Sequence, residues 1–217
     1  MKCMLGTRTI TSGAAMAALA LILAFLPLSF PFPPIPYLRF DPAEIPVFIS
    51  LLGFGPLPAL ITNLVYYFVL LAVGEFTPVG PTMKFLAVAS SLLGFWLGSR
   101  MVYARGFKPM LAAGTLLGTV LRVLAMTAAN YVILLILFPE FLGLATTLLG
   151  AFLGMDISAG QAGFFLVLVF TAVYNILHMG FSLVPTILLL KAIQKTRALG
   201  SAWTPWMIQA STGKRQP

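Results

Sequence analysis

Four polar side chains stand inside long apolar stretches of the chain, where they could bind a ligand. Arg122 and Asn130 share one face of an expected helix with Met126, because residues four apart lie one above the other. Asn175 and His178 share a face of a second expected helix in the same way. Polar side chains within a membrane segment are costly to bury, so they often mark a functional site.

The two groups reach a similar depth in their segments. At 1.5 Å per residue, Arg122 lies about 20 Å from the end of its segment at Pro109. Asn175 and His178 lie about 23 Å and about 18 Å from the end of theirs at Leu190. We therefore predict a polar pocket in the outer half of the membrane. Alternatively, Arg122 pairs internally with a carbonyl group or with Asn175, and His178 is a hydrogen-bonded packing residue.

Nothing in the sequence indicates catalysis. The chain has one His and one Cys, and it contains no metalloprotease, nucleophile-elbow, P-loop or dinucleotide-binding pattern in the required context. An enzyme acting on lipid head groups would need an acid/base pair within the spans, and we find none. We therefore expect a non-enzyme without catalytic residues, metal site or cofactor, which cannot be an ATP-driven pump by itself.

The composition places the chain in a lipid bilayer. It is 60% hydrophobic and 8% charged, with a mean hydropathy of +1.02. A soluble domain of 217 residues cannot bury so much apolar surface. The net charge of +8 is spread along the chain rather than gathered on a basic face, so no nucleic acid partner is expected.

The apolar runs predict an all-α integral membrane protein, with six transmembrane helices in a single domain of residues 1–197. The spans are expected at about 11–30, 44–54, 57–73, 83–99, 109–138 and 163–190. The first run is too long for a secretory signal and no small-residue cleavage site follows it, so we expect a retained span. Residues 139–160 are expected to form an outer loop, and residues 198–217 a polar cytoplasmic tail.

The charges predict the orientation. With the N-terminus in the cytoplasm and six crossings, all five acids fall outside and ten of the thirteen basic residues fall inside. These ten are Lys2, Arg8, Arg100, Arg105, Lys108, Lys191, Lys195, Arg197, Lys214 and Arg215. Because Lys and Arg near span ends favour the cytoplasmic side, we expect a multi-pass protein of the cell membrane with both termini inside.

The long loop between the first two spans is expected to be an ordered outer lid. Five prolines between positions 32 and 46 restrict its conformations. Loops of this kind commonly carry function. Tyr37 and Phe40 are among the aromatic side chains that could wall a pocket beneath it.

The first span carries small residues at helical spacing. Ala14 and Ala18 lie four residues apart, and small side chains at this spacing let a second helix approach closely in lipid. The second helix could belong to this chain or to a partner subunit, and the spacing alone favours neither.

Four segments, in this order, resemble the substrate-binding S components of energy-coupling factor (ECF) vitamin transporters, most closely the riboflavin-binding group. They are Leu-Arg-Phe-Asp-Pro-Ala-Glu-Ile-Pro at 38–46, Gly-Pro at 55–56, Arg-Val-Leu-Ala-Met-Thr-Ala-Ala-Asn-Tyr at 122–131 and Tyr-Asn-Ile-Leu-His-Met-Gly at 174–180. The resemblance covers nearly the whole chain. Each motif is weak alone, whereas four in order are fairly specific.

The resemblance implies a prokaryotic protein that binds a vitamin outside the cell and passes it to a transmembrane coupling subunit with two ATPase subunits. It further implies that Asn130 and Asn175 lie near the flavin pocket and that Ala14 and Ala18 dock the coupling subunit. Two positions depart from the riboflavin group: His178 stands where a Lys is usual, and Lys84 where an Asn is usual before Phe85.

Three hypotheses follow. The first is an S component for riboflavin. Its site would include Arg122, Met126 and Asn175, together with Lys84 and His178, the two residues that differ from the riboflavin group. The second is an S component for a different vitamin or small metabolite. The third is a structural subunit of a membrane complex without a ligand, which would have no reason to keep polar groups at matching depth.

Overall fold

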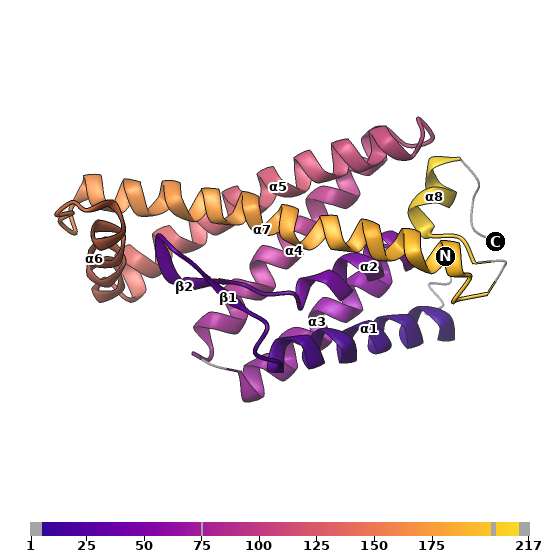
Figure 1. Ribbon diagram of the computed structural model, residues 1–217, viewed down its shortest axis with the longest axis horizontal. Helices are drawn as coiled ribbons and strands as arrows, with labels where there is room; N and C mark the ends of the chain where they lie inside the picture. Colours follow the sequence, from indigo (N-terminus) through magenta and orange to yellow (C-terminus); the bar gives the residue numbers. More distant parts are fainter. Residues whose placement is uncertain (1–5, 75, 201–202, 213–217) are drawn as a thin grey trace.

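The computed structural model describes residues 6–74, 76–200 and 203–212, and most of them are helical (Figure 1). Within these described ranges, five helices are long and apolar enough to cross a membrane. They are α1 (Thr7–Phe25), α3 (Pro56–Val73), α4 (Val79–Met101), α5 (Phe107–Val132), which continues as a π-helical turn η1 (Ile133–Leu137), and α7 (Gln161–Thr196). The remaining elements are α2 (Glu44–Phe54), α6 (Glu140–Leu153), α8 (Trp206–Ser211) and the strands β1 (Phe30–Phe32) and β2 (Ile35–Phe40).

The long helices coincide with five of the predicted spans, and α2 takes the place of the sixth. With 11 residues, α2 is about 16 Å long, roughly half of the thickness of a hydrocarbon core. It therefore cannot cross a bilayer alone. One other segment also differs from the sequence prediction: the outer loop predicted at 139–160 contains α6. Within the expected lid, β1 and β2 pair as an antiparallel hairpin.

Helices α1, α5 and α7 run along the length of the molecule, α6 lies across it, and the two ends of the molecule differ (Figure 1). At one end lie the first turn of α1, the last turn of α7 and α8; we call this the α8 end. At the other lies α6, and we call this the α6 end. The hairpin reaches from the middle of the molecule toward the α6 end, whereas α2 runs from the middle toward the α8 end. The middle is thus where the chain passes from hairpin to helix.

The sequence accounts for the break between α2 and α3. Gly55 ends α2 with φ of 108°, a conformation that other residues rarely adopt, and Pro56 occupies the first turn of α3. Each helix is apolar on nearly every face, as expected for a helix surrounded by lipid and by other helices.

Helices α4 and α5 form the closest pair of the bundle. Gly94 and Gly98 on α4 face Leu117–Gly118 and Ala113–Gly114 on α5, and an added Cβ at either glycine would collide with the α5 backbone. Such small-residue contacts let two backbones approach in lipid, where no hydrophobic effect drives helices together. The pair therefore fixes where Arg122 of α5 lies relative to α4.

The segment predicted as a polar tail contributes to the core at the α8 end. Met207 of α8 is fully buried among residues of α2 and α5, and Trp206 lies against Gly55. Trp203 packs on Phe54 with ring centroids 5.9 Å apart. Residues 213–217 of the predicted tail, including Lys214 and Arg215, lie outside the described residues, as does Lys2.

Candidate functional site

The centre of the site is a buried ion pair between Arg122 of α5 and Glu44, the first residue of α2. Both side chains are 1% exposed. The guanidinium donates two parallel hydrogen bonds, from one terminal nitrogen to Glu44 Oε2 at 2.8 Å and from the other to Oε1 at 2.9 Å. Bidentate pairing of this kind is among the strongest polar contacts in proteins and fixes the orientation of both groups.

Side chains from α4 and α7 complete the network around this pair. Arg122 donates from Nε to Asn175 Oδ1 at 3.0 Å, and one of its terminal nitrogens lies 3.4 Å from Ser91 Oγ. Ser182 donates to Glu44 Oε2 at 3.1 Å. Four helices, α2, α4, α5 and α7, thus meet at one set of charge-assisted hydrogen bonds.

His178 of α7 connects the network to the hairpin. Its Nδ1 lies 3.3 Å from Arg122 and 2.9 Å from the hydroxyl of Tyr174, while its Nε2 lies 3.6 Å from Glu44 Oε1. The same Nε2 is 3.4 Å from the backbone nitrogen and oxygen of Asp41, directly after β2. The imidazole therefore contacts four residues, and it connects the ion pair to the lid through Asp41.

A second ion pair holds the turn between β2 and α2. Lys84 of α4 pairs with Asp41, whose other carboxylate oxygen accepts a hydrogen bond from the backbone of Ala43 at 2.7 Å. This bond caps the turn that leads into α2. The ammonium of Lys84 also lies 5.2 Å from the ring centroid of Tyr66 on α3. Both acids near the centre of the molecule are thus paired with a cation.

Aromatic rings of the hairpin cover the network. Phe40 is 7% exposed and lies edge-on to His178, with centroids 5.6 Å apart, and 5.1 Å from the ring of Tyr174. The Tyr174 hydroxyl donates to the backbone oxygen of Arg39 at 2.6 Å, so α7 holds β2 by a polar contact as well. The predicted ordered lid is therefore a packed hairpin, closed on α7.

The structure brings together most, though not all, of the side chains selected from the sequence. Arg122, Asn175 and His178 meet in the network, Phe40 covers it, and Lys84 lies at its edge through Asp41. The internal pairing of Arg122 with Asn175, considered above as an alternative, is present.

The other selected side chains lie apart from the network. Asn130 lies two helical turns beyond Arg122, and its amide donates to the backbone oxygen of Met126 at 2.7 Å. Both residues are buried, 9% and 8% exposed. Tyr37 is 46% exposed on the hairpin.

Sequence analysis missed the partner of Arg122. Glu44 was placed at the outer edge of a span, whereas the structure buries it at the middle of the molecule. One signal was available: a buried guanidinium needs a carboxylate, and Glu44 is an acid at the first turn of an apolar helix. Its distance of 78 residues from Arg122 along the chain gave no indication of contact.

Two further polar groups beside the site were also missed. Asn63 Oδ1 and the hydroxyl of Tyr66, both on α3, are buried and have no hydrogen-bond partner within the described part of the chain. Tyr66 belongs to the same buried apolar cluster as Ala43, the residue before Glu44. Because buried polar atoms in native proteins are nearly always bonded, these two are open for a ligand or a water molecule. In the described ranges, no group of three or more His, Cys, Asp or Glu side chains could hold a metal ion.

Comparison with known proteins identifies first the fold and then the family. The fold matches a solved structure reported as the S component of a bacterial ECF transporter, with a TM-score of 0.66 over 88% of this chain and 97% of that one, at 22% identity. The chain is 33% identical over 136 residues to riboflavin transporter RibU of Staphylococcus aureus (strain TCH60), covering 60% of this chain and 67% of RibU. It is 32% identical over 133 residues to riboflavin transporter FmnP of Bacillus subtilis (strain 168), covering 58% and 66%.

These similarities establish the family. No protein-family model matches the sequence. Even so, the identity to RibU over two thirds of its length, together with the shared fold, shows that the chain belongs to the ECF S components of the riboflavin group. The resemblance seen in the four sequence segments is confirmed.

The buried ion pair generates a stability prediction. Glu44→Gln removes the carboxylate and leaves Arg122 charged and unpaired, which should lower the free energy of unfolding by about 3–5 kcal/mol. Glu140→Gln is the matched control, because Glu140 is an exposed first-turn acid of α6. Thermal unfolding in detergent measures both variants. An equal melting temperature for Glu44→Gln and Glu140→Gln would contradict a structural role for the pair.

Proposed function

We propose that the chain is the substrate-binding S subunit of an ECF transporter and that its ligand is riboflavin. The observation that carries the proposal is the similarity to two riboflavin transporters, which spans about 60% of the chain. The network adds a physical argument. Each acid in it is paired with a cation, Glu44 with Arg122 and Asp41 with Lys84, so the site suits an uncharged ligand with polar edges.

Riboflavin has a flat aromatic ring with hydrogen-bonding edges and an uncharged hydroxylated chain. A ligand of this kind requires apolar walls and a few convergent polar groups. The proposed set of ligand-binding residues is Tyr37, Phe40, Lys84, Arg122, Met126, Asn130, Asn175 and His178. Phe40 and Met126 would supply walls, and Asn130 would bind directly through Oδ1, which has no partner among the described residues. Asn175 would act chiefly by orienting Arg122.

Isothermal titration calorimetry on the purified protein tests the ligand. Riboflavin should bind tightly, and its phosphate ester, FMN, should bind more weakly because its added charge finds no uncompensated cation in the network. Tight binding of another vitamin, with none of riboflavin, would favour an S component of different specificity. Absence of any vitamin ligand in a folded protein would favour a purely structural subunit.

The unpaired hydroxyl of Tyr66 provides a prediction within the site. If riboflavin bonds to it, Tyr66→Phe leaves a buried polar edge of the ligand unpaired and should weaken binding about tenfold, the effect of roughly 1.4 kcal/mol. Tyr67→Phe removes the same atom from the next residue, whose hydroxyl lies 3.4 Å from Thr82 Oγ1, and should leave the affinity unchanged. Equal riboflavin affinities of Tyr66→Phe and the unmodified protein would show that the Tyr66 hydroxyl of α3 does not bind the ligand.

The partner of this chain is the ECF module, and we propose that α1 docks its transmembrane coupling subunit, which carries two ATPase subunits. Gly13, Ala17 and Ala20 of α1 are buried, and Gly13 lies against Ile61 of α3. Ala14 and Ala18 are exposed on a different face of α1. Their small side chains would let a partner helix approach closely in the bilayer.

Bulky substitutions separate docking from packing. Ala14→Trp or Ala18→Trp should abolish riboflavin uptake by cells while leaving riboflavin binding by the isolated subunit intact, since only the approach of the partner is blocked. Ala17→Trp is the contrasting variant, because Ala17 is fully buried and its enlargement should destabilise the subunit itself. Loss of binding in Ala14→Trp and Ala18→Trp would show that both alanines serve internal packing.

We further propose that both termini are cytoplasmic, so that the α8 end faces the cytoplasm. The first turn of α1 and α8 lie at the same end of the molecule (Figure 1). The basic residues of this end that the structure describes are Arg8, Arg100, Arg105, Lys108, Lys191, Lys195 and Arg197. A six-pass topology would follow if β2 and the turn before α2 complete the crossing that α2 is too short to make.

Cysteine labelling tests this orientation in a Cys3→Ser background. Ser158→Cys and Arg105→Cys both change exposed residues, near the α6 end and the α8 end respectively. An impermeant thiol reagent added to intact cells should label Ser158→Cys and not Arg105→Cys. The reverse pattern would invert the topology and exclude a lid that faces the outside.

A further inference from the structure

Helix α6 lies across the long axis of the molecule, at the end opposite to α8 (Figure 1). One face of it is buried and apolar. The residues of this face lie in one cluster with side chains of the hairpin; the cluster includes Leu142, Ala145 and Leu149 of α6 with Phe32 and Ile35. Helix α6 is therefore part of the surface on which the lid packs.

The other face of α6 is exposed, and it is apolar as well. Leu144, Thr147 and Ala151 share this face at spacings of three and seven residues, and all three are exposed. The hydroxyl of Thr147 donates to the backbone oxygen of Gly143 at 2.8 Å, so it is satisfied within the helix. The sequence from 141 to 155 contains no charged residue. A helix that is hydrophobic all round is normally covered on every side, so the exposed face calls for apolar surroundings.

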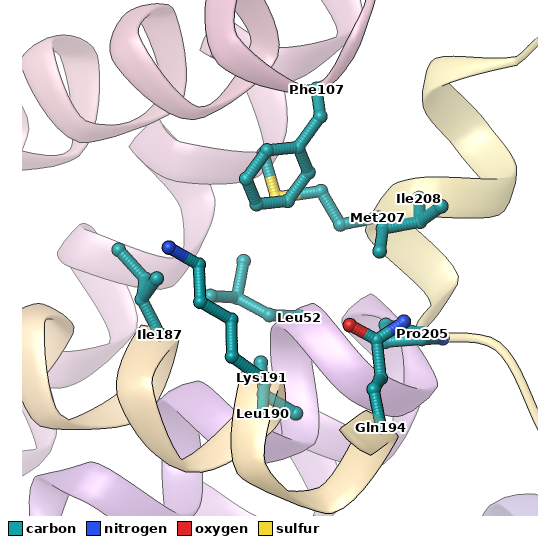
Figure 2. Close-up of a pocket in the computed structure, with 9 residues that line it drawn as sticks. All are labelled: Leu52, Phe107, Ile187, Leu190, Lys191, Gln194, Pro205, Met207 and Ile208. Atoms are coloured by element: carbon teal, nitrogen blue, oxygen red, sulfur yellow. The ribbon is translucent and has the colours of Figure 1, made fainter.

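The length of α7 shows at which level of a bilayer α6 lies. From its first residue, Gln161, to Leu190, α7 contains no Asp, Glu, Lys or Arg, over a length of about 45 Å. The first polar side chains after this run, Lys191 and Gln194, flank a small pocket at the α8 end (Figure 2). A bilayer with its head groups is about 40–45 Å thick. With Lys191 at one membrane surface, the start of α7 and the neighbouring α6 lie at the other.

The surroundings of α6 fit a helix that lies in the plane of that surface. Exposed acids flank its two ends, Glu140 in the first turn and Asp156 shortly after the last. The exposed apolar surface continues on the neighbouring elements, where Ile136 of η1 and Phe165 of α7 are 63% and 68% exposed. Interfacial helices place an apolar face about 5–10 Å into the boundary between head groups and acyl chains. The lipid-facing surface of the bundle thus extends onto α6 without a polar break.

We propose that α6 is an interfacial helix whose exposed face inserts among the acyl chains of one leaflet. With the α8 end in the cytoplasm, as proposed above, this is the outer leaflet. Because the opposite face of α6 packs with the hairpin, the membrane surface holds an element on which the lid rests. The proposal goes beyond riboflavin binding and does not depend on it.

Electron paramagnetic resonance of the full chain in phospholipid nanodiscs tests the insertion. Nitroxide labels are attached to Leu144→Cys and Ala151→Cys, each in a Cys3→Ser background. Both labels should collide more often with oxygen, which dissolves among acyl chains, than with a water-soluble nickel complex. Ile176→Cys, on the exposed side of α7, should behave in the same way. Ser158→Cys, in the exposed loop after α6, should show the opposite preference and is the matched control.

The depths of the labels test the orientation of α6. Leu144 and Ala151 are seven residues apart, so their labels should lie at the same depth if α6 lies in the plane of the membrane. On a helix that crosses the membrane, the same spacing separates two labels by about 10 Å, as expected for Val169→Cys and Ile176→Cys on α7. A depth difference of that size on α6 would overturn the proposal. A preference for the nickel complex equal to that of Ser158→Cys would overturn it as well. Neither result would bear on riboflavin binding, which is measured separately.

Discussion

The structure depends on one buried interaction, the ion pair between Arg122 and Glu44. A guanidinium within an apolar bundle is tolerated only with a carboxylate and further hydrogen bonds, because its desolvation is otherwise too costly. The pair therefore determines where α2 must begin. Glu44 is the first residue of that helix, and it has to lie beside Arg122 at the middle of the bundle rather than at its edge. For this reason α2 is short and the preceding chain enters the molecule as a hairpin.

The same pair positions the lid. Asp41, three residues before Glu44, is fixed by Lys84 and contacts His178, which itself contacts Arg122. Phe40 then lies over His178 and Tyr174. Movement of the hairpin away from α7 would break these aromatic contacts and leave the ion pair in place, because the pair belongs to α2 and α5. A ligand could thus enter under the hairpin without exposing an unpaired charge.

Much of this arrangement follows from the sequence, and its limits have physical reasons. Hydropathy locates the five long helices, because a bilayer allows few alternatives for an apolar run. Counting 1.5 Å per residue from the expected ends of the spans correctly brings Arg122, Asn175 and His178 to one depth. Pairing between Arg122 and Glu44 is not visible in spacing, since it joins residues 78 apart through the fold.

Other features could not be predicted from the sequence, for related reasons. The hairpin has only two short strands, and its register follows from packing on α7 rather than from alternation in the sequence. The segment 203–211 is short and flanked by polar residues, so its burial of Met207 becomes evident only once α2 and α5 provide the opposing surface. The open hydroxyl of Tyr66 likewise requires knowledge of every neighbouring atom.

The most direct test of the central claim is riboflavin binding by the double variant Glu44→Gln, Arg122→Met. Replacing both partners removes the charges together, so this protein should regain much of the stability that the single change loses. If the pair organises the ligand site, the double variant should remain folded and bind riboflavin at least tenfold more weakly than the unmodified protein. A folded double variant with undiminished affinity for riboflavin would contradict the account.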